Sequence, residues 1–128
     1  MIFAAALLIS LQAGGGCSAV TPRLTQAVRR TEAARVSTLA GRRVRPAEVS
    51  HIIADRNWRL VFATPEDAER GVFVMRRSGR NYRLVETWGG VLEPSDRGDA
   101  ARWARGLPGG GVPATLANCM DRAILAGR

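Results

Sequence analysis

The sequence predicts an α+β domain, in which an antiparallel sheet of three to four strands is packed by N-terminal and C-terminal helices. Apolar runs rich in Val, Leu, Phe, Tyr and Trp are typical of strands, and short segments with turn residues separate them. Patterns typical of amphipathic helices flank these runs, and we expect the helices to cover one face of the sheet. Parallel strands need crossovers of about a dozen residues, so the short connections indicate antiparallel pairing. The runs are Trp58–Ala63, Val72–Met75 and Tyr82–Trp88.

The composition is that of one ordinary globular domain. The chain has 128 residues, of which 46% are hydrophobic and 23% charged, and this balance excludes wholesale disorder. The formal net charge is +8, and all 19 basic residues are arginine. Arginine suits phosphate and carboxylate recognition, but these residues are spread from Arg23 to Arg128. We therefore attribute the excess of arginine to coding bias rather than to one binding surface.

The first 13 residues, MIFAAALLISLQA, carry no charged side chain. This stretch is too short to cross a bilayer, which takes about 20 apolar residues, but it has the length of the apolar region of a signal peptide. Small residues follow it at positions 13–16. We therefore predict a signal peptide at residues 1–16, with cleavage between 13 and 19, and a single domain at residues 17–128. The predicted location is periplasmic or secreted, and a buried N-terminal helix or strand is the alternative.

The two cysteines, Cys17 and Cys119, lie near opposite ends of the predicted domain. In an oxidising compartment they would form a disulfide, which in the chain-entropy model stabilises the folded state by up to about 4–5 kcal/mol. Cleavage after Ala19 would instead remove Cys17 and leave Cys119 as a buried thiol. The segment ending at Cys17 also resembles a bacterial lipoprotein box, although Gly14 stands where Leu is usual; lipidation of Cys17 would anchor the protein to a membrane. The cysteine spacing fits no metal motif, and we expect no cofactor.

Capping residues predict the helices near the N-terminus. Thr21 and Pro22 indicate the start of a first helix, and Gly41 indicates its end. Pro46 predicts the start of a second helix. The apolar residues of that second helix are Val49, Ile52 and Ile53.

The second predicted helix would place His51 and Asp55 on one face, four residues apart. This spacing suits a metal or a proton-transfer pair, but it is far more common in ordinary surface contacts. The sequence also has a single histidine and no serine in a nucleophile elbow. We therefore predict no catalytic residue and no enzyme, with a His51–Asp55 enzyme as the weakest alternative.

Within the sheet, alternation predicts that Trp58, Leu60 and Phe62 share one face of the first strand. The second strand is apolar on both faces, which predicts a central position. A capping pattern at residues 64–67 predicts one helical turn between these two strands. Residues 91–93 are a candidate fourth strand.

Two further helices are predicted near the C-terminus. The Pro94-Ser95-Asp96 segment indicates the start of a helix that ends near Arg105, and Pro113 indicates the start of the last helix. The last helix has the cleanest amphipathic pattern in the chain and is expected to pack on the sheet. The three tryptophans, Trp58, Trp88 and Trp103, are expected in the core rather than in a ligand groove.

The loop at residues 78–81 joins two predicted strands, and its length leaves the register open. A loop of two or four residues sets Met75 opposite Leu84 and Arg76 opposite Arg83. A loop of three residues pairs Arg76 with Tyr82 instead.

The tip of this hairpin carries the densest basic cluster in the chain, with an aromatic residue inside it. Such a cluster can bind an anionic polymer or an acidic protein surface. It can also simply keep an exposed hairpin from pairing with its neighbours. The candidate binding residues are Arg76, Arg77, Arg80, Tyr82 and Arg83.

Together these features predict a small exported, non-enzymatic binding domain. We expect its partner to be another protein or an anionic component of the cell envelope, with membrane association only if Cys17 is lipidated. The alternative is an intracellular, basic nucleic-acid-binding protein, whose affinity would fall steeply with salt as counterions are released.

Overall fold

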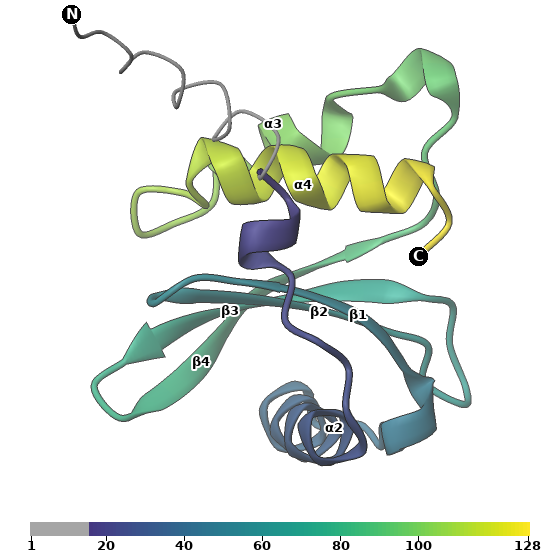
Figure 1. The fold of residues 1–128 in the computed structure, drawn as a ribbon, viewed down its shortest axis with the longest axis vertical. Coiled ribbons are helices and arrows are strands. Elements are labelled where there is room, and N and C mark those ends of the chain that lie inside the picture. The colour runs from purple at the N-terminus through teal and green to yellow at the C-terminus, as the bar shows by residue number, and fades with distance from the viewer. Residues whose placement is uncertain (1–15) are drawn as a thin grey trace, which may run out of the picture.

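The computed structural model describes residues 16–128, which form a four-stranded antiparallel sheet between two helical layers (Figure 1). Helix α2 (Gln26–Ala40) lies against one face, and α3 (Asp99–Arg105) and α4 (Ala114–Leu125) lie against the other. The predicted α+β class, with helices from both ends of the chain packed on the sheet, is confirmed. The helices cover both faces rather than the one that we expected. Nearly all of the predicted signal peptide, residues 1–15, lies outside the described residues.

The strands follow one another in space in the same order as in the sequence. They are β1 (Val49–Ala54), β2 (Trp58–Ala63), β3 (Gly71–Ser78) and β4 (Asn81–Gly89), and each pairs with the next. The predicted second strand is thus central, as β3. Within residues 16–128, no helix is long and apolar enough to span a membrane.

Strand β1 corrects the predicted second helix. Pro46 opens only a single 3₁₀ turn, η3 (Pro46–Glu48), before the chain becomes extended. Ile52 and Ile53 point to opposite faces of the sheet, and both are fully buried. Adjacent buried isoleucines fit a strand that is covered on both sides, and β-branched residues favour that conformation. The same apolar spacing had suggested a helix because it also fits a helical stripe.

The alternating side chains of β2 build two separate cores. Trp58, Leu60 and Phe62 are buried under α3 and α4, which confirms the predicted shared face. Val61 and Ala63 point the other way and pack with residues of α2. Neither core is complete without its own helical layer, because both faces of the central strands are apolar.

The β3–β4 hairpin turns through two residues. Ser78 pairs with Asn81, so Gly79 and Arg80 form the turn, and the φ of 64° at Gly79 suits glycine. The register that sets Arg76 opposite Arg83 is therefore present, and the three-residue alternative is excluded. These two arginines lie on the α3 and α4 side of the sheet.

A β-bulge interrupts this hairpin further along. Met75 faces Leu84 as the two-residue register predicts, but Val74 faces Glu86 and not Val85. The extra residue twists the strand locally, as bulges do. The pattern of apolar residues does not reveal it.

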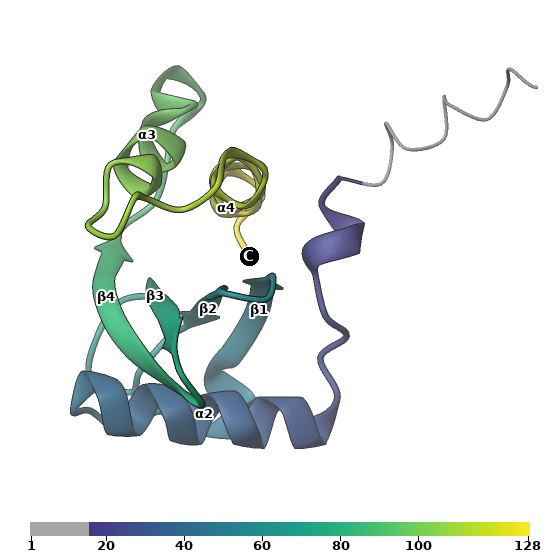
Figure 2. The same ribbon diagram turned by 90° about the vertical axis from the view of Figure 1, so that its left-hand side faces the viewer.

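The first helix starts later than predicted and ends where predicted. The side chain of Thr25 accepts a hydrogen bond from the Val28 amide at 3.2 Å, so α2 begins after Thr25 rather than at Thr21–Pro22. Gly41 ends it with a φ of 68°. The residues between Val20 and Thr25 run past the β1 edge of the sheet instead (Figure 2).

Three shorter predictions are also wrong. Residues 64–67 form a turn without helix, closed by a 3.2 Å hydrogen bond from the Ala68 amide to the Pro65 carbonyl. Residues 91–93 form no strand. Pro94–Asp96 makes only a 3₁₀ turn, η4, and α3 begins at Asp99. At Pro65 and at Pro94 a proline starts a local turn that does not continue into a helix.

The two C-terminal helices are joined through a buried carboxylate. Asp121 of α4, only 5% exposed, accepts hydrogen bonds from the amides of Gly98 and Ala101 at 3.0–3.1 Å. These amides belong to the first turn of α3, where unpaired N–H groups favour a negative charge. Trp103 of α3 meets Trp88 edge to face at 5.3 Å, at the margin of the core that contains Trp58.

The loop between α3 and α4 passes close to the backbone at the end of α3, and glycine substitutions test this close approach. Gly110 and Gly111 both have positive φ, but only at Gly111 would a Cβ overlap the carbonyl of Arg105. We expect Gly110→Ala to cost about 1 kcal/mol for its backbone conformation alone. Gly111→Ala should cost at least about 3 kcal/mol, because the loop must also move. Denaturant unfolding of both variants measures the difference, and equal losses would contradict the close approach.

Candidate functional site

The five predicted binding residues do not form one surface. Arg76 and Arg83 face the α3 and α4 layer, whereas Arg77 and Tyr82 face the α2 layer, because neighbouring residues of a strand alternate. Arg80 lies in the turn between them. The predicted cluster is therefore divided between the two sides of the sheet.

Arg76 is held by contacts inside the domain. Its guanidinium lies 5.3 Å from the ring centroid of Trp58 and donates a hydrogen bond to the carbonyl of Gly109. It thus ties the hairpin to the loop between α3 and α4. Arg77 donates from Nε to the carbonyl of Gly79 at 3.1 Å and stabilises the turn. These two arginines have structural roles in addition to their charge.

The other face of the hairpin contains an open hollow against α2, which we call the α2–hairpin groove. It has a volume of about 420 Å³, and its chief lining residues are Arg35, Thr38, Leu39, Arg80, Asn81 and Tyr82. The guanidinium of Arg35 lies over the Tyr82 ring at 4.6 Å from its centroid. The structure thereby joins two predicted residues, Arg80 and Tyr82, to a residue from a distant part of the sequence.

A buried ion-pair network fixes Arg35 in this position. Glu32 is 1% exposed, and its carboxylate oxygens lie 2.6 Å from Nη1 of Arg35 and 2.7 Å from Nε of Arg59. Arg59 projects from β2 toward α2, so the network joins the helix to the sheet. One carboxylate faces two guanidinium groups, and the network keeps a net positive charge beside the groove.

Polar residues of α2 contact three of the four strands along the helix. Arg29 donates a hydrogen bond to the Val49 carbonyl of β1. Glu32 reaches β2 through Arg59, and Arg35 reaches Tyr82 of β4. Residues three apart on a helix lie on nearly the same face, which explains this progression.

Sequence reasoning missed Glu32 and Arg35. The available signal is the position of Glu32, four residues after Val28 and four before the buried Val36, which puts a carboxylate on the buried stripe of the helix. A buried carboxylate needs a cationic partner, and arginines are abundant around it. Nothing in the sequence indicates Tyr82 as the next neighbour.

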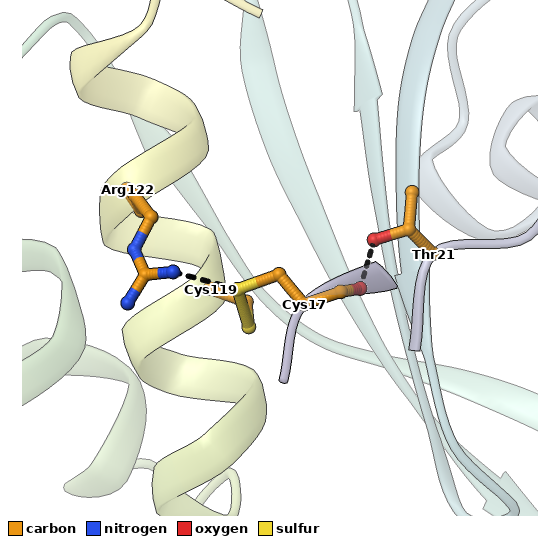
Figure 3. The surroundings of a disulfide bond; sticks show 4 residues. All are labelled: Cys17, Thr21, Cys119 and Arg122. Carbon is orange, nitrogen blue, oxygen red and sulfur yellow. Dashed lines mark hydrogen bonds between the residues drawn. A yellow bond between two sulfur atoms is a disulfide. The ribbon is translucent and has the colours of Figure 1, made fainter. Parts of the chain in front are cut away.

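The predicted pairing of the cysteines is present in the structure (Figure 3). Cys17 and Cys119 form a disulfide with their Cα atoms 5.5 Å apart. The hydroxyl of Thr21 donates to the Cys17 carbonyl, and Nη1 of Arg122 lies 3.5 Å from the Cys17 sulfur. The disulfide thus fastens the segment before α2 to α4.

His51 and Asp55 do not share a helix face, which overturns the geometry of that alternative. Asp55 lies in the turn after β1, where its carboxylate accepts hydrogen bonds from the Asn57 and Trp58 amides at 2.8 Å. His51 lies on β1 and meets the Phe62 ring edge to face at 5.2 Å. Within residues 16–128, no three His, Cys, Asp or Glu side chains lie together as metal ligands.

Comparison of the chain with protein-family models, with curated proteins and with solved structures gave no match.

The ion-pair network predicts the effect of removing its carboxylate. Glu32→Gln leaves Arg35 and Arg59 without a counter-charge, although both are partly exposed and can turn toward water. We expect a loss of about 1–3 kcal/mol in the free energy of unfolding. Glu69→Gln, at an exposed position, should change it by less than about 0.5 kcal/mol. Equal effects in denaturant unfolding would show that the network does not hold α2 on the sheet.

The environment of His51 predicts a pH dependence. Burial, and then the charge of Arg128, hold the pKa of His51 below its ordinary value of 6.5. As the pH falls below 6.5, the unfolded chain takes up a proton that the folded protein does not, so stability decreases until the lowered pKa is reached. His51→Gln removes the titrating group and therefore this part of the pH dependence of stability. Unfolding measured across this range should show a smaller acid-induced loss in the variant than in the native protein.

Proposed function

We propose that this protein is an exported, non-enzymatic binding domain that recognises an acidic segment of another protein through the α2–hairpin groove. The observation that carries the proposal is the arrangement of Arg35 and Arg80 around the exposed side of Tyr82 in an open hollow. None of the described residues that line this hollow is acidic.

The residue types of the groove suit a carboxylate partner. The guanidinium fork of arginine matches the two oxygens of a carboxylate, and tyrosine and arginine are enriched among residues that dominate protein interfaces. Thr38 and Asn81 add hydrogen-bonding groups at the margin, and Leu39 adds apolar surface. The Glu32 network holds Arg35 over Tyr82 before any partner arrives, which lowers the entropic cost of binding.

The distribution of arginine favours a protein over a nucleic acid. A nucleic acid requires a basic stripe along one surface, where several phosphates are neutralised together. Here the hairpin arginines are divided between two faces, and Arg76 and Arg77 already have partners within the domain. A groove of about 420 Å³ accommodates one or two side chains of a peptide.

The disulfide supports the export part of the proposal. Disulfides persist in oxidising compartments and are rare in the bacterial cytosol. The Cys17–Cys119 bond requires that Cys17 remain in the mature protein, so a signal peptide would be cleaved on the N-terminal side of Cys17.

Charge reversal at the turn tests the groove directly. We expect Arg80→Glu to weaken binding of a labelled oligoglutamate peptide about tenfold, because it replaces attraction by repulsion. Arg23→Glu is the matched control: it makes the same change in net charge at an exposed position before the other end of α2. It should weaken binding by less than about twofold. Fluorescence anisotropy measures the affinities, and thermal melting shows that both variants fold.

Three outcomes would contradict the proposal. If both variants bind equally, recognition depends on net charge and the groove has no special role. If anionic lipid vesicles bind more tightly than the peptide, the partner is an envelope component. If a single-stranded oligonucleotide binds more tightly, with affinity that falls steeply as salt rises, the nucleic-acid alternative replaces this function.

A further inference from the structure

A second hollow lies on the opposite side of the sheet, between β1, α4 and the segment before α2. Its volume is about 440 Å³, within the range of small-molecule sites. Cys17 and Thr21 form one wall, His51 and Ile53 of β1 a second, and Cys119 and Arg122 of α4 the third. We call it the disulfide cavity. None of its lining residues lines the α2–hairpin groove, so an inference here does not rest on the proposed function.

The disulfide cavity has an apolar interior. Ile53 and Ala123 of α4 line it and are only 1% and 8% exposed, so apolar side chains close the hollow on the side of the core. Both cysteines of the disulfide also line it. This surface can take a small hydrocarbon group away from water.

The charged groups of the cavity all have the same sign. The exposed side chains of Arg122 and Arg128 line it, and Arg122 lies with Nη1 3.5 Å from the Cys17 sulfur (Figure 3). None of the described lining residues is Asp or Glu. His51 is half-buried, and its lowered pKa keeps the imidazole neutral near pH 7, so one ring nitrogen can donate a hydrogen bond and the other accept one.

We infer that the disulfide cavity binds a small amphiphilic organic anion. Its apolar body lies on Ile53 and Ala123, and its carboxylate or phosphate head is bound by Arg122 and Arg128 with a hydrogen bond from His51. Guanidinium groups bind both kinds of head group through paired N–H donors. The site requires the intact disulfide. Cys17 and Thr21 form one wall of the cavity, and the disulfide holds the segment before α2 that carries them against α4.

Hexanoate and hexyl phosphate are the probes, and hexanol is the neutral control of the same chain length. We expect hexanoate or hexyl phosphate to shift NMR signals of His51, Ile53 and Ala123 and to bind at least about tenfold more tightly than hexanol. The tighter of the two anions identifies the head group. Equal binding of hexanol, or shifts located elsewhere on the protein, would overturn the inference.

Two variants separate the anion site from a general effect of positive charge. Arg122→Gln with Arg128→Gln should lower the affinity for the better anion to that for hexanol. Arg105→Gln with Arg102→Gln removes the same charge from exposed positions of α3 and should leave the affinity within about twofold. An unchanged affinity in the first variant would exclude these arginines as the binding groups.

Reduction of the disulfide supplies an independent readout. The reduced protein should retain the circular dichroism of the fold but lose anion binding, because the wall at Cys17 is released. If reduction unfolds the domain, the arginine variants with the disulfide intact still decide the question. Retained binding in a folded, reduced protein would overturn the dependence on the closed wall.

The pH dependence of binding tests the role of His51. The charged groups that face it are the guanidinium groups of Arg122 and Arg128. A bound anion favours the imidazolium, so the affinity for hexanoate should rise as the pH falls below 6.5 in the native protein and stay flat in His51→Gln. The same pH profile in both proteins would exclude contact between His51 and the anion.

Discussion

Strands β2 and β3 carry apolar side chains on both faces, and the burial of both faces determines the architecture of this domain. Their apolar residues point alternately up and down, and each set requires its own layer of helix. The chain meets this requirement with segments from its two ends, α2 on one side and α3 with α4 on the other (Figure 2). The groove and the cavity then arise where each layer meets an edge of the sheet. Both candidate sites are consequences of that two-sided burial.

The two sites differ in how their charges are held. In the α2–hairpin groove, a buried carboxylate orients Arg35, so the positive charge is rigid and partly compensated. At the disulfide cavity, Arg122 and Arg128 are exposed and reach over an apolar interior. A rigid guanidinium stacked on an aromatic ring suits a defined side chain of a protein partner, whereas exposed guanidinium groups over an apolar interior suit a small ligand with a charged head. Arginine abundance alone would not distinguish these cases.

Sequence reasoning recovered the features that depend on local pattern. The strand at Trp58–Ala63 follows from alternation, and the helix end at Gly41 follows from turn chemistry. The pairing of Cys17 with Cys119 was predicted only on the condition that Cys17 is retained in an oxidising compartment. It failed at β1, because Ile52 and Ile53 fit a helical stripe as well as a two-sided strand, and only the presence of α2 decides between them. Of the residues that line the groove, the sequence predicted Arg80 and Tyr82 as binding candidates. Arg35 lies on α2, far from them in the sequence, and only tertiary packing brings it to the groove.

The disulfide also determines how the domain responds to tension. Cys17 and Cys119 enclose the whole sheet and both α2 and α3 in one covalent loop. A pull applied before Cys17 and after Cys119 passes through the sulfur–sulfur bond and the last turns of α4, so the strands inside the loop carry no load. The hairpin and its groove would keep their shape under such a pull. If the chain is held at both ends, the cysteine pair isolates the α2–hairpin groove from the tension.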